Sequence, residues 1–215
     1  GYFETVTLSE DDLKRNDMYR ANAQRAKAQS RFADYHEYLL SLEMTAEVGD
    51  FSPLYLQRIT QLTNKSNQFN LTTKRYTAEQ MEEVYNSDEY IRLYGKLFDK
   101  FGDNGVVAVT IGKIDSEDKG RLDIELWLMS CRVLKRDMEL AMLDSLVAQA
   151  KKRGISEIYG HYYPTAKNKM VAGLYESFGF EKISQDEEGN TAWRLLVEGY
   201  EDKNTVIKVK EEHYA

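Results

Sequence analysis

The feature that most constrains the fold is a strict alternation of side chains between residues 122 and 129. One series of alternate positions is Leu122, Ile124, Leu126 and Leu128, and the other is Asp123, Glu125, Trp127 and Met129. Alternation of this kind is typical of a β-strand, whose successive side chains point to opposite faces. A short loop and an amphipathic helix over residues 137–153 follow, and Gly154 stands where a helix C-terminal cap is expected. The sequence therefore predicts a strand–loop–helix unit.

The rest of the second half continues to alternate between strands and helices. A turn at 103–105 is expected to precede a strand at 106–114, and a polar loop fills 115–120. The later predicted elements are a strand at 155–163, a helix at 168–178 that ends before Gly179, and a hairpin of strands at 180–183 and 191–197. This order favours an α/β fold with a mixed central sheet flanked by helices.

The first half begins with a long helical segment. Ser9 resembles a helix cap, and no Pro or Gly occurs from there to about Met44, so one amphipathic helix is expected over this stretch. It serves either as a linker or packing helix or as a binding element. A strand at 45–51, a helix that starts at Pro53, a polar loop at 64–73 and a helix capped by Thr77 and Gln80 complete the region.

We expect three parts: a helical lead-in at 1–44, the main domain at 45–200 and a charged, partly ordered tail at 201–215. The chain of 215 residues is 42% hydrophobic, enough for one core.

No apolar run approaches the length of a membrane span, and no secretory signal is visible, so a cytoplasmic protein is expected. The single cysteine excludes an internal disulfide, and the three scattered histidines argue against a metal site. The net charge of −7 disfavours nucleic acids and membrane surfaces as partners.

The loop between the strand at 122–129 and the next helix is the first candidate site. A helix N-terminus presents unpaired backbone N–H groups and a positive dipole end, which suit a pyrophosphate. Lys135 and Arg136 place two cations beside it. A solvated turn with basic residues is the alternative interpretation of the same pattern.

Residues further along the chain connect this loop to a known fold. Asn168, Tyr175, Gly179 and Phe180 give the pattern N-x6-Y-x3-G-F after the strand–loop–helix–strand order. This arrangement resembles the GNAT acetyltransferase-like fold. The resemblance implies that the loop residues Arg132, Val133, Leu134, Lys135, Arg136 and Asp137, with Asn168, bind coenzyme A or another phosphopantetheine thioester. It also implies that Tyr175 protonates the leaving thiolate.

A narrower resemblance covers most of the chain. The segments FSPLYLQRITQLTNKSNQFNLTT (51–73), FGDNG (101–105), WLMSCRVL (127–134) and PTAKN (164–168) are similar to the FkbH-like family. That family joins a haloacid-dehalogenase-like (HAD) domain to a GNAT-like domain and loads a glyceryl unit onto an acyl carrier protein for polyketide biosynthesis. The resemblance implies two partners, the acyl carrier protein and the HAD-like domain. The DxDGT motif of the HAD half is absent from this sequence.

The loop departs from the GNAT pattern at two positions where glycine is expected, Lys135 and Asp137. Asp137 would repel phosphate, or it caps the helix. Other candidate residues also have two interpretations. Tyr175 is the general acid or a core residue, Cys131 holds an acyl group or is a small buried residue, and His161 is a base or a structural histidine. Glu125 faces either the cleft or solvent.

Two functions follow from these observations. In the first, the domain transfers an acyl group from a thioester bound between the strands at 122–129 and 155–163, as in glyceryl- or methoxymalonyl-carrier-protein biosynthesis. In the second, the coenzyme A site is degraded and the domain docks an acidic carrier protein through basic residues. The basic candidates are Lys135, Arg136, Lys151, Lys152 and Arg153.

Overall fold

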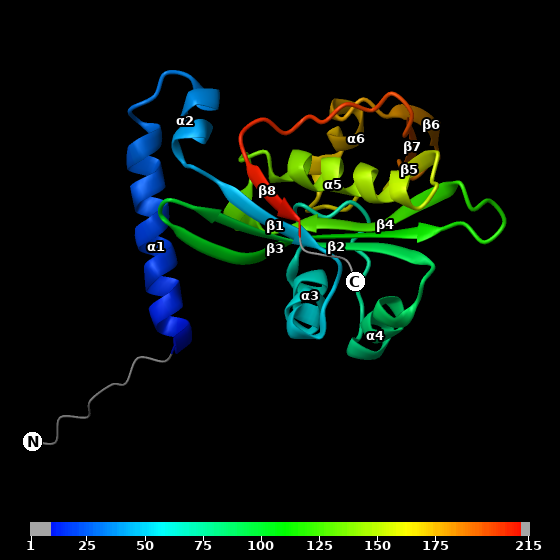
Figure 1. Cartoon of the computed structure of the whole chain (residues 1–215), viewed down its shortest axis with the longest axis horizontal. Helices are drawn as coiled ribbons and strands as arrows, with labels where there is room; N and C mark the ends of the chain where they lie inside the picture. The colour runs from blue at the N-terminus through cyan, green and yellow to red at the C-terminus, as the bar shows by residue number, and fades with distance from the viewer. Residues whose placement is uncertain (1–9, 212–215) are drawn as a thin grey trace, which may run out of the picture.

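The computed structural model, which describes residues 10–211, is built on one mixed sheet of eight strands (Figure 1). The strands lie in the order β6-β7-β5-β4-β3-β2-β1-β8, and only the β4–β5 and β1–β8 pairs are parallel. The strands are β1 (Thr45–Gly49), β2 (Tyr90–Asp99), β3 (Gly102–Ile114), β4 (Arg121–Met129), β5 (Glu157–Tyr162), β6 (Glu181–Gln185), β7 (Thr191–Leu196) and β8 (Lys208–Glu211). The predicted α/β class with a mixed sheet is confirmed.

Helices cover both faces of this sheet. They are α1 (Glu10–Gln29), α2 (Tyr35–Ser41), α3 (Pro53–Lys65), α4 (Ala78–Asn86), α5 (Met138–Lys152) and α6 (Leu174–Ser177), with 3-10 turns η1 (Cys131–Val133) and η2 (Lys169–Val171). In Figure 1, α3 and α4 lie below the sheet, and α5 and α6 lie above it. Burial of apolar residues on the two faces gives two cores, one under α5 and one under α3 and α4.

The α5 face shows how closely the layers pack. A Cβ atom added at Gly95 of β2 would lie 2.5 Å from the Met138 side chain and 2.8 Å from that of Met142. Glycine at this position therefore lets the first turns of α5 rest directly on the sheet. The start of α5, where the candidate loop ends, is fixed by this contact.

Several predicted helix boundaries are confirmed. The α5 helix occupies the expected residues, and Gly154 after it has φ +74°, as a C-terminal cap requires. At the start of α4, Thr77 and Gln80 form the reciprocal capping box. Pro53 opens α3 as expected, although the Ser52 side chain makes no capping hydrogen bond.

The prediction of a single long N-terminal helix was wrong. The α1 helix ends at Gln29, and a separate helix, α2, begins after Asp34, whose carboxylate accepts a hydrogen bond from the His36 N–H. Asp34 thus caps a new helix start. The predicted start at Ser9 lies outside the described residues. The apolar positions that suggested one helix mostly belong to α2, where Leu39 and Leu42 are buried in the core.

The strand β2 was not predicted, and the turn at 103–105 was misplaced. The turn between β2 and β3 lies at residues 100–101, and Asp103, Asn104 and Gly105 form part of β3. Gly105 has φ +71°, and the β2–β3 register shifts nearby between Lys96 and Phe98. Residues 103–105, whose types are typical of turns, lie in an irregular stretch of strand and not in the turn itself.

The end of the domain also differs from expectation. The predicted helix at 168–178 is only η2 followed by the four-residue α6, because Asn168 uses its side chain in other hydrogen bonds. In the charged tail, residues 208–211 form β8 at the edge of the sheet. The Asp144 carboxylate of α5 holds the preceding loop by accepting hydrogen bonds from the Tyr200 hydroxyl and from the N–H groups of Lys203 and Asn204.

Candidate functional site

The centre of the candidate site is the place where β4 and β5 part. The two strands are paired only at Arg121–Glu157, Leu122–Ile158 and Asp123–Tyr159. Beyond Asp123, β4 continues to Met129 without β5 as a neighbour. This gap between the strands is where the sequence predicts an acyl thioester.

The protein's own chain fills this gap. Residues 69–72, which we call the wedge, lie along β4: the N–H of Met129 donates to the Phe69 carbonyl at 3.0 Å, and the N–H of Leu71 donates to the Trp127 carbonyl at 3.1 Å. On the other side, the N–H of Tyr163 donates to the Leu71 carbonyl at 2.9 Å. The backbone groups that face the gap thus bond to the wedge. Asn70 and Leu71 are fully buried in this position.

Asn168 locks the wedge in position. Its side chain is fully buried, and its Nδ2 donates to the carbonyls of Asn70 and Tyr163, both at 2.9 Å. Its Oδ1 accepts from the N–H of Thr165 at 2.7 Å. The amide predicted to bind a cofactor is therefore occupied by the protein's own backbone.

Tyr175 is a core residue in this structure. It is 1% exposed, its ring lies 6.4 Å from that of Trp127, and it packs so tightly on β5 that a Cβ at Gly160 would lie 2.4 Å from the ring. Among residues 10–211, its hydroxyl has no hydrogen-bond partner within normal distance. Burial raises the pKa of Tyr175 strongly, and the nearby His161 backbone offsets this only in part. A buried hydroxyl with a strongly raised pKa does not fit the predicted role of general acid.

The loop after β4 keeps an unusual backbone. Lys135 has φ +63° and Asp137 has φ +67°, both in the left-handed region. These are the two positions where the GNAT resemblance leads us to expect glycine, so the backbone adopts the glycine-like shape without glycine. Within the loop, Val133 is buried, Leu134 is half-buried, and Arg132 and Lys135 are exposed.

Two acids lie at the N-terminus of α5. Asp137 occupies the N-cap position, but its carboxylate makes no capping hydrogen bond, so the capping role was wrong. Burial raises the pKa of Asp137, and burial, with the Asp137 charge as a further cause, raises the pKa of Glu139. One Glu139 oxygen is buried and has no hydrogen-bond partner in the part of the chain that the structure describes. These carboxylates oppose an anionic ligand at this helix end.

Arg136 does not face solvent, which corrects its predicted place in a basic patch. It is 6% exposed and lies 3.3 Å from Asp99, which Arg25 of α1 also binds through two contacts of 2.6 and 2.9 Å. The Tyr35 hydroxyl of α2 donates to the Lys135 carbonyl. The N-terminal helices are thereby tied to the loop. No sequence pattern indicated the roles of Arg25, Asp99 or Tyr35.

Cys131 is exposed and lies just beyond the filled gap, at the start of η1. Its Sγ donates to the side-chain oxygen of Gln68, the residue before the wedge, at 3.3 Å. Arg132 follows it directly. Arg58 of α3 is close enough to Arg132 that burial and the Arg132 charge together lower the pKa of Arg58. The thiol is therefore accessible, and the exposed Arg132 is its neighbour in the chain.

His161 belongs to a separate cluster. Its Nε2 lies 2.8 Å from Asp123 Oδ1, and Arg121 binds the same carboxylate through contacts of 2.9 and 3.0 Å. Burial alone would raise the pKa of Asp123, but the hydrogen bonds from His161 and Arg121 outweigh it and lower that pKa. Asp123 precedes Cys131 by eight residues, about 26 Å of extended strand. The structure therefore does not bring His161 and Cys131 together.

Glu125 faces outward, where its carboxylate pairs with Lys74 at 3.2 Å. Asp123 and Gln68, which contact predicted site residues, were missed at the sequence level. Asp123 could have been found from its two-residue spacing to Glu125 on the same strand. Gln68 carried no such signal, because it lies in a stretch expected to be an ordinary loop.

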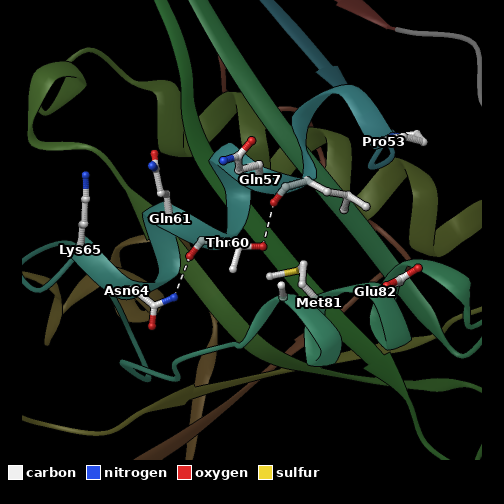
Figure 2. Close-up of a pocket in the computed structure, with 10 residues that line it drawn as sticks. Pro53, Gln57, Thr60, Gln61, Asn64, Lys65, Met81 and Glu82 are labelled. Atoms are coloured by element: carbon white, nitrogen blue, oxygen red, sulfur yellow. Dashed lines mark hydrogen bonds between the residues drawn. The ribbon is translucent and has the colours of Figure 1, made fainter.

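The opposite face of the sheet carries an open groove of about 590 Å³ between α3 and α4. Figure 2 shows Gln57, Gln61, Asn64 and Lys65 along α3, with Met81 and Glu82 contributed by α4. The Thr60 hydroxyl and the Asn64 amide bond to the helix backbone. No residue predicted for the site lines this groove.

Within residues 10–211, no group of His, Cys, Asp and Glu side chains is arranged to hold a metal ion. In the same part of the chain, no helix is long and apolar enough to cross a membrane. No protein-family model matches the sequence, and no curated protein matches it.

Solved structures do match. The ribosomal-protein-S18-alanine N-acetyltransferase of Escherichia coli aligns with a TM-score of 0.53 and 13% identity, over 75% of this chain and 99% of that one. The GNAT domain of S. lividans PAT aligns with a TM-score of 0.53 and 16% identity, over 69% of this chain and 89% of that one. A Salmonella typhimurium protein solved with its cofactor acetyl-CoA aligns with a TM-score of 0.53 and 13% identity, over 74% of this chain and 96% of that one. The chain has the GNAT acetyltransferase fold.

Proposed function

We propose that this chain is the GNAT-like domain of an FkbH-like protein and that it relays an acyl group through Cys131 to the phosphopantetheine thiol of an acyl carrier protein. The observation that carries the proposal is the position of Cys131. It is the exposed thiol at the entrance of the filled gap, with Gln68 bonded to it and Arg132 beside it. The GNAT fold and the segments that resemble the FkbH-like family support the thioester chemistry.

The relay consists of two balanced thioester exchanges. The deprotonated sulfur of Cys131 attacks the donor thioester carbonyl, the carbon–sulfur bond to the donor breaks, and the departing thiolate takes up a proton. The carrier thiolate then attacks the Cys131 thioester, and Cys131 leaves as the thiolate. Arg132 and the nearby Arg58 supply positive charge close to the carbonyl oxygen that becomes negative in each step. Tyr175 takes no part, because it is buried.

Because Cys131 is the single cysteine of the sequence, one experiment tests the relay cleanly. The protein is incubated with acetyl-coenzyme A and, separately, with a glyceryl thioester of an acyl carrier protein, and its intact mass is followed. We expect a hydroxylamine-sensitive adduct that Cys131→Ser abolishes. The control, Tyr175→Phe, should form the adduct at the wild-type rate. Absence of an adduct with both donors, or an equal transfer rate in Cys131→Ser, would contradict the proposal.

The filled gap favours a second candidate function, a carrier-docking module that has lost its coenzyme A site. The wedge occupies the expected thioester slot, and Asp137 and Glu139 oppose phosphate at the loop. Under this function, calorimetric titration with coenzyme A shows no binding at millimolar ligand, a carrier protein binds, and no adduct forms. Turnover therefore distinguishes the two candidates: only the relay produces an acylated Cys131.

A further inference from the structure

We infer that an acidic carrier protein docks on the surface formed by Phe32, Tyr35, Arg58, Arg132 and Lys135, which we call the loop-mouth surface. This inference rests on the proposed function for its partner, and it adds where that partner binds. Cys131 lies within this surface, so a carrier bound there brings its flexible arm to the thiol without entering the filled gap.

The apolar part of the surface comes from the N-terminal segment. Phe32 is 37% exposed and Tyr35 is 42% exposed, and both rings pack on buried Tyr38 at centroid distances of 6.3 and 5.6 Å. The hydroxyl of Tyr35 donates to the Lys135 carbonyl, which holds its ring against the loop. Large aromatic side chains held rigidly and left exposed are typical of protein–protein contact sites.

The charged part comes from three cations. Within residues 10–211, none of Arg58, Arg132 and Lys135 has a carboxylate partner at ion-pair distance. Arg58 and Arg132 lie near enough to repel each other, although the chain as a whole carries a net charge of −7. Of the acids around Tyr35, Asp137 and Glu139 are partly buried, whereas Asp34, whose carboxylate accepts from the His36 N–H, and Glu37 are exposed. Unpaired cations gathered on an otherwise acidic protein favour an acidic partner by charge complementarity.

This location replaces the basic patch expected from the sequence. Arg136 is buried against Asp99, so it is unavailable. Lys151 and Lys152 lie at the opposite end of α5 from Lys135, about 22 Å away at the rise of an α-helix. They belong to a different surface. The two lysines therefore provide a matched test of which surface the carrier uses.

The experiment measures binding of a phosphopantetheinylated acyl carrier protein by calorimetry, with the full chain carrying Cys131→Ala so that no chemistry interferes. We expect the double variant Arg132→Glu/Lys135→Glu to weaken binding at least tenfold. The equally charged control Lys151→Glu/Lys152→Glu should change it less than twofold. Tyr35→Ala should weaken binding about fivefold, and Tyr35→Phe, which keeps the ring, should weaken it less. Thermal unfolding of each variant verifies that it is folded.

The outcomes separate the docking surface from the relay. Equal weakening by both charge pairs, no effect of Arg132→Glu/Lys135→Glu, or no binding by the Cys131→Ala chain overturns the loop-mouth surface. If an adduct still forms on Cys131 in that case, the proposed relay stands and only its docking site is wrong. Binding that depends on the loop-mouth surface, without any adduct, supports the surface and overturns the relay.

Discussion

The two sides of the β4 C-terminal end differ sharply. Inside, the gap between β4 and β5 is filled by the wedge, with Leu71 fully buried and its backbone bonded on both sides. Outside, Cys131 and the exposed cations of the loop face solvent. The comparison teaches that one fold can keep the backbone of a ligand-binding loop while its own chain occupies the slot beside it. Under the proposed relay, chemistry at this end of the sheet takes place at the surface.

The strongest test of the closed interior is Asn168→Ala. This change removes the donor from the carbonyls of Asn70 and Tyr163 and the acceptor from the Thr165 N–H; the first of these hydrogen bonds is buried and the other two are partly buried. Unpaired buried polar groups cost about 1–3 kcal/mol each, so we expect a loss of roughly 3 kcal/mol in the free energy of unfolding. Urea denaturation measures it. The neighbouring exposed change Lys167→Ala should stay within about 0.5 kcal/mol.

A loss below about 1 kcal/mol in Asn168→Ala would mean that the wedge is held loosely, and the contrast between interior and surface would weaken. The same variant sharpens the comparison in a second way. If the chemistry is confined to the surface, folded Asn168→Ala protein should still form the Cys131 adduct, since Asn168 does not contact Cys131 in this structure.

The next effect concerns Glu139, at the border between the two regions. Burial raises its pKa above the usual 4.5, so the folded protein favours the protonated form more than the unfolded chain does. The contribution of Glu139 to the free energy of unfolding is fully present below pH 4.5 and is lost as pH rises through the folded-state pKa of Glu139. We expect Glu139→Gln to remove this loss and to be more stable than wild type at pH 7.

Urea denaturation across pH 4 to 8 measures the difference, and the exposed change Glu187→Gln is its control. Identical pH profiles for wild type and Glu139→Gln would show that the carboxylate is solvated in solution. The N-terminus of α5 would then belong to the open surface rather than to the closed interior.

The smallest expected effect is at the loop backbone. Lys135 adopts φ +63°, which costs an L-residue about 1–2 kcal/mol, while glycine loses about 0.5–1 kcal/mol of chain entropy. Lys135→Gly should therefore stabilise the protein by roughly 0.5 kcal/mol. In contrast, Arg20→Gly in the exposed middle of α1 should cost about 1 kcal/mol. Thermal unfolding measures the change in stability of both variants. A less stable Lys135→Gly variant would mean that residue 135 adopts a negative φ in solution.

Elements with an uninterrupted local pattern could be predicted from the sequence. The strand β4 and the helix α5 follow from alternation and helical spacing, and the capping box of α4 follows from Thr77 and Gln80. The strand β2 was missed. Register shifts occur beside Gly95 and Lys96 in β2, and β4 carries one of its own between Ile124 and Leu126.

The site was harder to predict because its polar residues are satisfied from far along the chain. Asn70 and Thr72 lie in a segment whose composition indicates a loop, and the segment is indeed irregular, yet it is buried. Its partners include Asn168 and the Glu125 carbonyl, which no local pattern can reveal. Asn168 and Tyr175 have the spacing of a ligand-binding helix, but here they face the wedge and the core.

The wedge also sets the order in which the molecule can assemble. Leu71 bonds to Trp127, 56 residues later, and to Tyr163, 92 residues later. Contacts between such distant residues close large loops, which slows folding. On a ribosome, the wedge emerges before either strand that it joins, so it can pair with β4 while β5 is still being made. Placement of β5 then completes the sheet against a surface already formed, and the final folding rate should depend on that late closure.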